Sequence, residues 1–187
     1  MNAALFGLRD LDAPVLAGVQ GVAAGAGLSL ALAADLILAA EDARFMLAYD
    51  RVGTTPDCGA SWFLPRRLGA RRAAQMMMLS RSLTAAEAMD WGLVAEIASA
   101  GGFGDAVEAL ARCLAAGPGL AHAAFRRLSD AASNSSFADQ LQAKRVVFLA
   151  MAAADSAEGV GACLERRPPG SADSREDMVI MIEDSRC

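Results

Sequence analysis

Residues 15–31 constrain the fold of this chain more than any other stretch. They begin with the apolar run 15–19, directly after Pro14, which is typical of a buried β-strand. A segment rich in glycine and alanine follows, and it leads into an apolar run over 28–34 that predicts a helix. A buried strand, a tight connection and an apolar helix in succession predict a layered α/β core.

The junction between this connection and the helix is a candidate oxyanion site. Gly25, Ala26 and Gly27 stand where the helix begins, and the first N–H groups of a helix have no partner inside it. Small side chains let a ligand oxygen approach the backbone closely, and the helix dipole favours negative charge at this end. The Ala26 N–H is therefore a candidate oxyanion donor, although small residues at such a junction also serve close packing.

Two other glycine motifs fit the same stretch poorly. A dinucleotide-binding fingerprint needs a third glycine where Leu30 stands. A nucleophile elbow centred on Ser29 needs a glycine where Ala31 stands, and small residues separate Ser29 from the strand. The sequence therefore favours neither a dinucleotide site nor a serine hydrolase.

The composition argues against several classes of protein. A chain of 187 residues with 55% hydrophobic residues is long enough for one domain with a sizeable core. The net charge of −5 argues against a nucleic-acid partner, because phosphate binding needs a basic surface. Asp35 interrupts the longest apolar run before it reaches the length of a membrane span, and residues 1–12 lack the order of a signal peptide. We therefore expect a cytoplasmic protein with no membrane partner.

Metal-binding residues are sparse. The four cysteines lie far apart and form no C-x-x-C pair, and His122 is the single histidine. This pattern predicts reduced thiols, no disulfide framework and no metal site.

The first half of the chain predicts a mixture of strands and helices. Short apolar runs predict strands over 36–39, 44–47 and 93–97. Helical patterns cover 1–11, 60–68 and 70–79. Thr84 and Glu87 form a capping box for a further helix, which ends at Gly92. Pro56 and two glycines mark residues 50–59 as a loop.

The second half predicts helices alone, over 105–116, 120–132, 137–153 and 156–165. This change of pattern divides the chain into a mixed core over 1–116 and a helical region over 117–170. The polar tail over 171–187 is expected to be poorly ordered, although its apolar run 178–182 is a candidate strand.

Several separate motifs, in this order, resemble the enoyl-CoA hydratase/isomerase (crotonase) family. They are residues 13–35, 43–45, 53–66, 83–88, 91–94 and 164–169, so that the likeness spans residues 5–169. The resemblance implies an α/β fold made of a spiral of ββα units, with a C-terminal helical region that forms trimers or dimers of trimers. It also implies acyl-CoA thioester substrates and an enolate intermediate. Coenzyme A is then part of the substrate, and no separate cofactor is expected.

In this family two backbone N–H groups hold the thioester oxygen, and the second falls on Ala26 between Gly25 and Gly27. The first comes from a loop among earlier strands, and no segment before Pro14 resembles that loop. We therefore expect an N-terminally incomplete spiral. A truncated, non-catalytic member that forms oligomers is one alternative, because losing one oxyanion donor typically costs about 2.7–4 kcal/mol in the transition state.

The two positions at which hydratases of the family carry acidic residues are not acidic in this chain. They fall on Ser29 and Tyr49 here, and a phenol that titrates near pH 10 is a poor base for adding water. Tyr49 is instead expected to orient the substrate or exclude solvent. In contrast, Asp57 stands where isomerases and aryl-CoA dehalogenases of the family carry a catalytic aspartate. Its alternative role is to cap the helix that begins near residue 60.

The nearest subgroup by resemblance is the ring-epoxide isomerases of phenylacetate breakdown, through residues 56–59 and 62–65. Trp62 and Phe63 are candidates for the wall of the acyl pocket, or for core packing. Facing this apolar wall, Asp57 is expected to have a raised pKa. We therefore predict an acyl-CoA isomerase in which Ala26 polarises the thioester and Asp57 moves a proton, with a hydratase or an aryl-CoA dehalogenase as alternatives.

Overall fold

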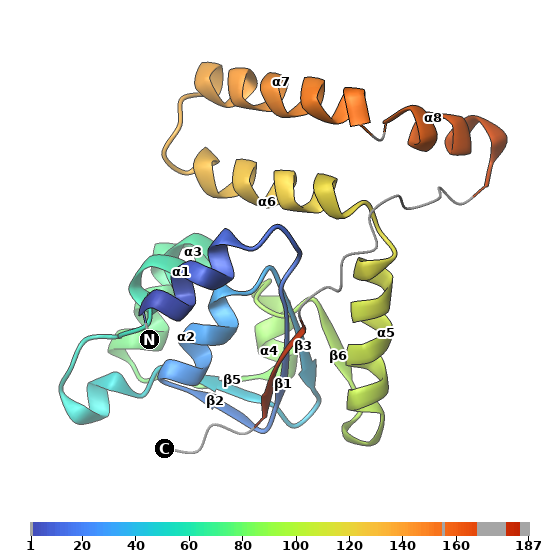
Figure 1. The fold of residues 1–187 in the computed structure, drawn as a ribbon. Helices are drawn as coiled ribbons and strands as arrows, with labels where there is room; N and C mark the ends of the chain where they lie inside the picture. Colours follow the sequence, from blue (N-terminus) through green and yellow to red (C-terminus); the bar gives the residue numbers. More distant parts are fainter. Residues whose placement is uncertain (1, 155, 168–178, 184–187) are drawn as a thin grey trace. The chain divides into compact units, whose positions relative to one another are not determined.

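The computed structural model describes residues 2–154, 156–167 and 179–183. The chain forms two compact units (Figure 1). The first contains Met1–Leu11, Val15–Ala111 and Met178–Cys187, and the second contains Asp12–Pro14 and Arg112–Asp177. The division after residue 111 lies slightly before the boundary expected at residue 116.

The first unit is built on a parallel sheet of four strands in the order β6-β3-β1-β7. These strands are β1 (Leu16–Gln20), β3 (Leu36–Ala40), β6 (Glu96–Ala98) and β7 (Val179–Glu183). Strand β1 lies between β3 and β7, which explains its near-continuous apolar sequence, because a central parallel strand is covered on both faces. Strand β6 begins three residues later than the expected strand over 93–97.

The apolar run near the C-terminus forms β7, which pairs in parallel with β1 from Leu16 to Gln20. The candidate strand expected over 178–182 is therefore present as Val179–Glu183, within a tail that was otherwise expected to be poorly ordered. The rest of that tail, 171–178 and 184–187, lies outside the described residues.

A second, smaller sheet has the order β2-β4-β5. Its strands are β2 (Val22–Ala24), β4 (Arg44–Met46) and β5 (Leu83–Thr84). Strand β2 was not expected, because three small residues beside glycines have the pattern of a turn rather than of a strand. It pairs in parallel with β4, and Gly25 follows directly after the last residue of β2.

Helix α2 (Ala26–Ala33) lies at the centre of the first unit. Leu28, Ala31 and Leu32 are buried, and the helix contacts α1 (Asn2–Asp10), α3 (Ala60–Met78) and strands of both sheets. A helix that is apolar on all sides must be covered on all sides, and α2 fulfils that rule. It begins two residues earlier than its apolar run, so that Ala26 is its first residue.

Local backbone signals of the sequence are present in the structure. Gly69 (φ 78°, ψ 156°) breaks α3 into two parts, which match the two helices expected over 60–68 and 70–79. Helix α4 (Ala85–Asp90) begins with the expected capping box, in which the Thr84 hydroxyl accepts a hydrogen bond from the Glu87 N–H, and the Glu87 carboxylate accepts one from the Thr84 N–H. A short 3-10 helix, η1 (Tyr49–Val52), covers the start of the expected loop over 50–59.

Helix α5 (Phe103–Ala115) follows the 3-10 turn η2 (Ala100–Gly102). Its first half packs on β1, where Gly18 has no side chain and lets the helix approach. A Cβ at Gly18 would lie 3.1 Å from a methyl carbon of Val107 and 3.2 Å from the Phe103 ring.

The second unit contains α6 (Gly119–Ala132), α7 (Phe137–Ala154) and α8 (Ser156–Glu165). Helix α7 packs along α6, where Gln140 Nε2 donates a hydrogen bond to the Leu128 carbonyl oxygen at 2.9 Å (Figure 1). Eight large apolar side chains of these helices are exposed. They are Phe125, Phe137, Leu141, Val146, Phe148, Leu149, Val160 and Leu164. In the described part of the chain, no helix is long and apolar enough to cross a membrane.

Candidate active site

The backbone around Gly25 is held in one orientation. Gly25 has φ 53° and ψ −116°, and its N–H donates to the Met46 carbonyl oxygen of β4 at 3.1 Å. Its carbonyl oxygen accepts hydrogen bonds from both the N–H and the hydroxyl of Ser29, each at 3.0 Å. The two bonds from Ser29 therefore fix the peptide unit that joins Gly25 to Ala26, and the bond to Met46 fixes the unit before it.

This arrangement determines where the Ala26 N–H points. In a trans peptide the C=O and the N–H point in opposite directions, and the Gly25 carbonyl points along the helix toward Ser29. The Ala26 N–H is consequently turned away from the helix. Among the described residues, no atom accepts a hydrogen bond from it. This is the geometry that an oxyanion donor requires.

Tyr49 lies against this junction. It begins η1, directly after Ala48 in the left-handed region (φ 61°), and only 9% of it is exposed. A Cβ at Gly25 would lie 3.8 Å from both the ring carbon Cζ and the hydroxyl oxygen of Tyr49. The phenol is therefore packed beside the Gly25 backbone, with its hydroxyl at the site.

The Tyr49 hydroxyl donates a hydrogen bond to Asp57 Oδ1. Asp57 lies in the loop between η1 and α3 and is exposed. Cys58 (φ 50°) and Gly59 (φ 78°) both follow it in the left-handed region and turn the chain into α3. The structure thus brings together Ala26, Tyr49 and Asp57, three of the expected site residues.

Two expectations about Asp57 are wrong. Its side chain does not cap α3, because Gly59 occupies the N-cap with no side-chain hydrogen bond, and only the Asp57 carbonyl oxygen accepts from the Ala60 N–H, at 3.1 Å. Its pKa is lowered rather than raised. The hydrogen bond from Tyr49 is the main cause, a second one involves Cys58, and the exposed carboxylate loses little hydration.

The pKa values of the two neighbours of Asp57, Tyr49 and Cys58, are shifted in the opposite direction. Burial is the main reason that the pKa of Tyr49 is raised, and the hydrogen bond to Asp57 adds to the effect. Burial also raises the pKa of the Cys58 thiol. At neutral pH the site therefore holds an ionised carboxylate beside a protonated phenol and a protonated thiol.

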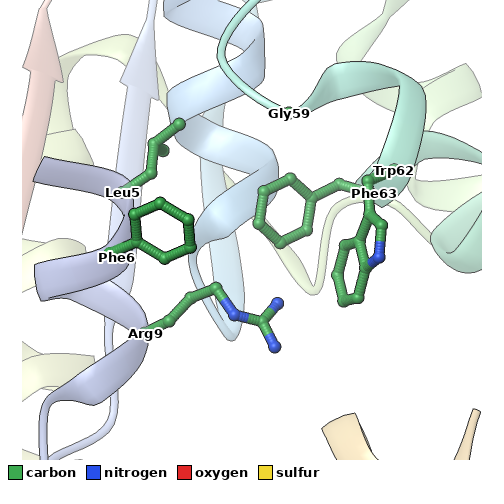
Figure 2. A pocket seen from close by; sticks show the side chains of 6 residues that line it. All are labelled: Leu5, Phe6, Arg9, Gly59, Trp62 and Phe63. Atoms are coloured by element: carbon green, nitrogen blue, oxygen red, sulfur yellow. The ribbon is translucent and has the colours of Figure 1, made fainter. Parts of the chain in front are cut away.

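A cavity of about 480 Å³ opens beside this loop (Figure 2). It is lined by Leu5, Phe6 and Arg9 of α1 and by Gly59, Trp62 and Phe63. The rings of Trp62 and Phe63 meet edge to face with centroids 4.9 Å apart. Both expected pocket residues therefore line a cavity, and Phe63 is also part of the core.

The contribution of α1 to this cavity was not predicted from the sequence. Phe6 and Arg9 lie more than fifty residues from Trp62, and no local pattern connects them. The Arg9 guanidinium lies 4.5 Å from the Trp62 ring centroid, and that of Arg66 lies 4.0 Å from it. Gly59 is needed here for two reasons, because its φ is positive and a Cβ would lie 3.0 Å from the Phe63 ring.

Metal binding finds no support here, since no group of three or more potential metal ligands occurs in the described residues. Gly27, also expected at the site, lies within the first turn of α2 next to Ala26. The arrangement can therefore hold an oxyanion on a backbone N–H and move a proton with a carboxylate, beside a largely apolar cavity.

Comparisons with known proteins found a family model and several relatives that match this chain. A family model described as enoyl-CoA hydratase/isomerase matches residues 2–173. The 1,2-epoxyphenylacetyl-CoA isomerase of Escherichia coli (strain K12) is 37% identical over 87% of this chain and 62% of its own length. A probable enoyl-CoA hydratase of Rhodobacter capsulatus is 43% identical over 83% of this chain and 61% of its own length. The chain thus spans about three fifths of these curated relatives.

Solved structures show the same similarity. The crystal structure of an enoyl-CoA hydratase from Polaromonas sp. JS666 superimposes with a TM-score of 0.86 at 36% identity. The match covers 91% of this chain and 66% of that one.

Proposed function

Because the chain belongs to the enoyl-CoA hydratase/isomerase family, we propose that it acts as an acyl-CoA isomerase that moves a double bond through an enolate of the thioester. One observation carries the proposal. The ionised Asp57 carboxylate is held by Tyr49, and Tyr49 packs on Gly25, directly before the candidate oxyanion donor Ala26.

The proposed reaction uses one backbone donor and one carboxylate. The Ala26 N–H donates a hydrogen bond to the thioester oxygen, which stabilises the negative charge that develops there. Asp57 removes a proton from the carbon next to the thioester, and the electron pair enters the enolate. The same carboxyl group returns that proton to the γ-carbon, so that the double bond shifts and no water is consumed. Coenzyme A enters and leaves as part of the substrate.

The site favours isomerisation over hydration. Adding water requires a base that activates the water, and of positions 29, 49 and 57 only the last carries a carboxylate. The Ser29 hydroxyl is fully buried and donates to the Gly25 carbonyl oxygen, and Tyr49 stays protonated because its pKa is raised. A single base that is used twice is sufficient for an isomerase.

We further propose that the cavity beside Gly59 receives the acyl group. Its rings and aliphatic side chains (Leu5, Phe6, Trp62, Phe63) suit an apolar acyl group that carries a ring. The name of the E. coli relative, which specifies an epoxyphenylacetyl group, supports this choice.

Hydration is the second candidate activity, because the Rhodobacter capsulatus relative at 43% identity is named a probable enoyl-CoA hydratase. Formation of a 3-hydroxyacyl-CoA, rather than a shifted double bond, distinguishes the two reactions.

The exposed apolar side chains of α6, α7 and α8 also lead us to propose self-association, as a homotrimer or a hexamer. Large exposed apolar side chains in this number on one helical unit are typical of a protein that buries them against another chain.

The decisive experiment compares wild type with Asp57→Asn in an assay of double-bond migration in enoyl-CoA substrates. We expect a loss of at least about a hundredfold in kcat with unchanged folding, because the amide cannot accept the proton. Asp50→Asn is the matched control, since Asp50 is exposed and lies close in sequence but makes no contact with the proposed proton path. An Asp57→Asn protein that keeps the wild-type rate contradicts the proposal.

A further inference from the structure

We propose that Tyr49 is the positioning residue for Asp57, holding the carboxylate at a fixed place relative to the oxyanion donor Ala26. This inference rests on the proposed isomerase function. Tyr49 was expected to orient the substrate or exclude solvent. Its hydroxyl instead donates a hydrogen bond to Asp57, the proposed base.

The two partners differ in mobility. Tyr49 is buried, and its ring packs on the Gly25 backbone. Asp57 is exposed in a loop without regular structure, and an exposed carboxylate in such a place rotates freely unless another group holds it. A hydrogen bond from a buried hydroxyl supplies that restraint. A carboxylate has about four lone-pair sites, so the bond from Tyr49 leaves sites for a substrate proton.

Backbone strain occurs on both sides of the pair. Ala48, directly before Tyr49, has φ 61°, and Cys58, directly after Asp57, has φ 50°. Residues with a Cβ rarely adopt this region, and such strain persists only where surrounding contacts hold it. Four non-glycine residues in the described part of the chain have a positive φ. Two of them are direct sequence neighbours of Tyr49 and Asp57, which share one hydrogen bond.

The same network continues to the oxyanion donor. The Tyr49 ring packs on Gly25, and the Gly25 carbonyl oxygen accepts a hydrogen bond from the Ser29 hydroxyl at 3.0 Å. The Gly25 carbonyl and the Ala26 N–H belong to the same peptide unit. Asp57 and the Ala26 N–H are consequently connected through the Tyr49 phenol and the Gly25 backbone on which it packs. This connection fixes the distance between the proton acceptor and the thioester oxygen, on which proton transfer depends.

Tyr49 is the only tyrosine of the chain, so the ultraviolet absorbance of tyrosinate reports this residue alone. Asp57 is the ionisable group that affects its pKa through direct contact, Cys58 neighbours the same carboxylate, and Asp50 and Arg51 follow Tyr49 in η1. In an alkaline titration we expect a midpoint above 10 for wild type. Asp57→Asn should lower the midpoint by about one unit, because the negative partner is lost.

Asp50→Asn is the control for this titration, since it removes the same charge from the neighbouring position without removing the hydrogen bond. We expect it to leave the midpoint within about 0.3 units of wild type. If the two variants shift the midpoint equally, or neither shifts it, the Tyr49–Asp57 pair does not exist in solution and the inference is overturned. This measurement needs no enzymatic activity.

The second arm is kinetic and uses Tyr49→Phe, which keeps the ring that packs on Gly25. We expect kcat to fall by about ten- to a hundredfold with KM within about twofold of wild type, because the base is misplaced while binding is unchanged. The acid limb of the kcat profile should also move to higher pH, because Asp57 loses the hydrogen bond that lowers its pKa. A purely structural role of Tyr49 predicts no such movement.

The outcomes separate the two proposals. Turnover of enoyl-CoA by wild type, with an equal kcat and an equal pH profile for folded Tyr49→Phe, overturns the positioning role alone. No double-bond migration by folded wild type overturns the proposed function and the positioning role together. If Tyr49→Phe does not fold, the titration of Asp57→Asn against Asp50→Asn still decides whether the pair exists.

Discussion

Asp35 and Val15 exchange two hydrogen bonds between the end of α2 and the start of β1. The Asp35 N–H donates to the Val15 carbonyl oxygen at 2.9 Å, and the Val15 N–H donates to Asp35 Oδ2 at 2.8 Å. Val15 is only 1% exposed, so water cannot replace the carboxylate. These bonds close the strand–helix unit that carries the candidate oxyanion donor.

Asp35→Ala should therefore destabilise the protein by about 1–3 kcal/mol, because it leaves a buried N–H without an acceptor. Equilibrium unfolding in urea measures the change. Asp35→Asn is the matched control, since its amide oxygen can still accept the bond, and it should cost less than the alanine variant. Equal losses for the two variants would show that the Val15 N–H does not depend on this side chain.

Gly25→Ala tests the conformation of the oxyanion loop. The nearest atom to a Cβ at this position is 3.6 Å away, so crowding is not the obstacle, and the cost comes from the backbone angles φ 53° and ψ −116°. We expect a loss of up to about 3 kcal/mol in the free energy of unfolding. We also expect a fall in kcat, because the Ala26 N–H changes direction.

Gly53→Ala serves as the control for Gly25→Ala. Gly53 has φ 69° and ψ 29°, and no atom lies within 4 Å of a Cβ built there. The variant should cost about 1 kcal/mol and leave kcat unchanged. If both variants affect activity to the same extent, Gly25 has no special part in the site.

The raised pKa of Tyr49 makes stability depend on pH in the alkaline range. The folded protein holds the phenolic proton more tightly than the unfolded chain, whose tyrosine titrates near pH 10. This contribution is therefore complete below about pH 10 and is lost as pH rises through the folded pKa. Unfolding of wild type and Tyr49→Phe between pH 8 and 11 should show a steeper loss for wild type. Parallel curves would contradict the shift.

Light scattering at micromolar concentration should give at least three times the monomer mass of 19.3 kDa. Phe148→Glu on α7 is expected to lower that mass, because it places a charge among exposed apolar side chains. Met89→Glu, at an exposed apolar position on α4 in the first unit, should leave the mass unchanged. A clean monomer of wild type would exclude the interface that we propose.

Much of the architecture was predictable because its signals are local. The apolar run before Gly25, the capping box of Thr84 and Glu87, and the break at Gly69 each depend on residues within one or two helical turns. The motifs around residues 53–66 and 83–94 also indicated the family, which the matching family model confirmed. Local propensity and spacing act before the chain has any tertiary structure.

Long-range contacts decided the rest. Strand β2 has no strand-like sequence and forms because β4 lies beside it, and β7 finds its partner β1 more than 150 residues away. The charge state of Asp57 also depended on the fold. Its sequence neighbours are apolar and suggest a raised pKa, but Tyr49 reaches it across the loop and lowers it. Such effects follow from which groups the folded backbone brings within hydrogen-bonding distance, and no local pattern encodes that distance.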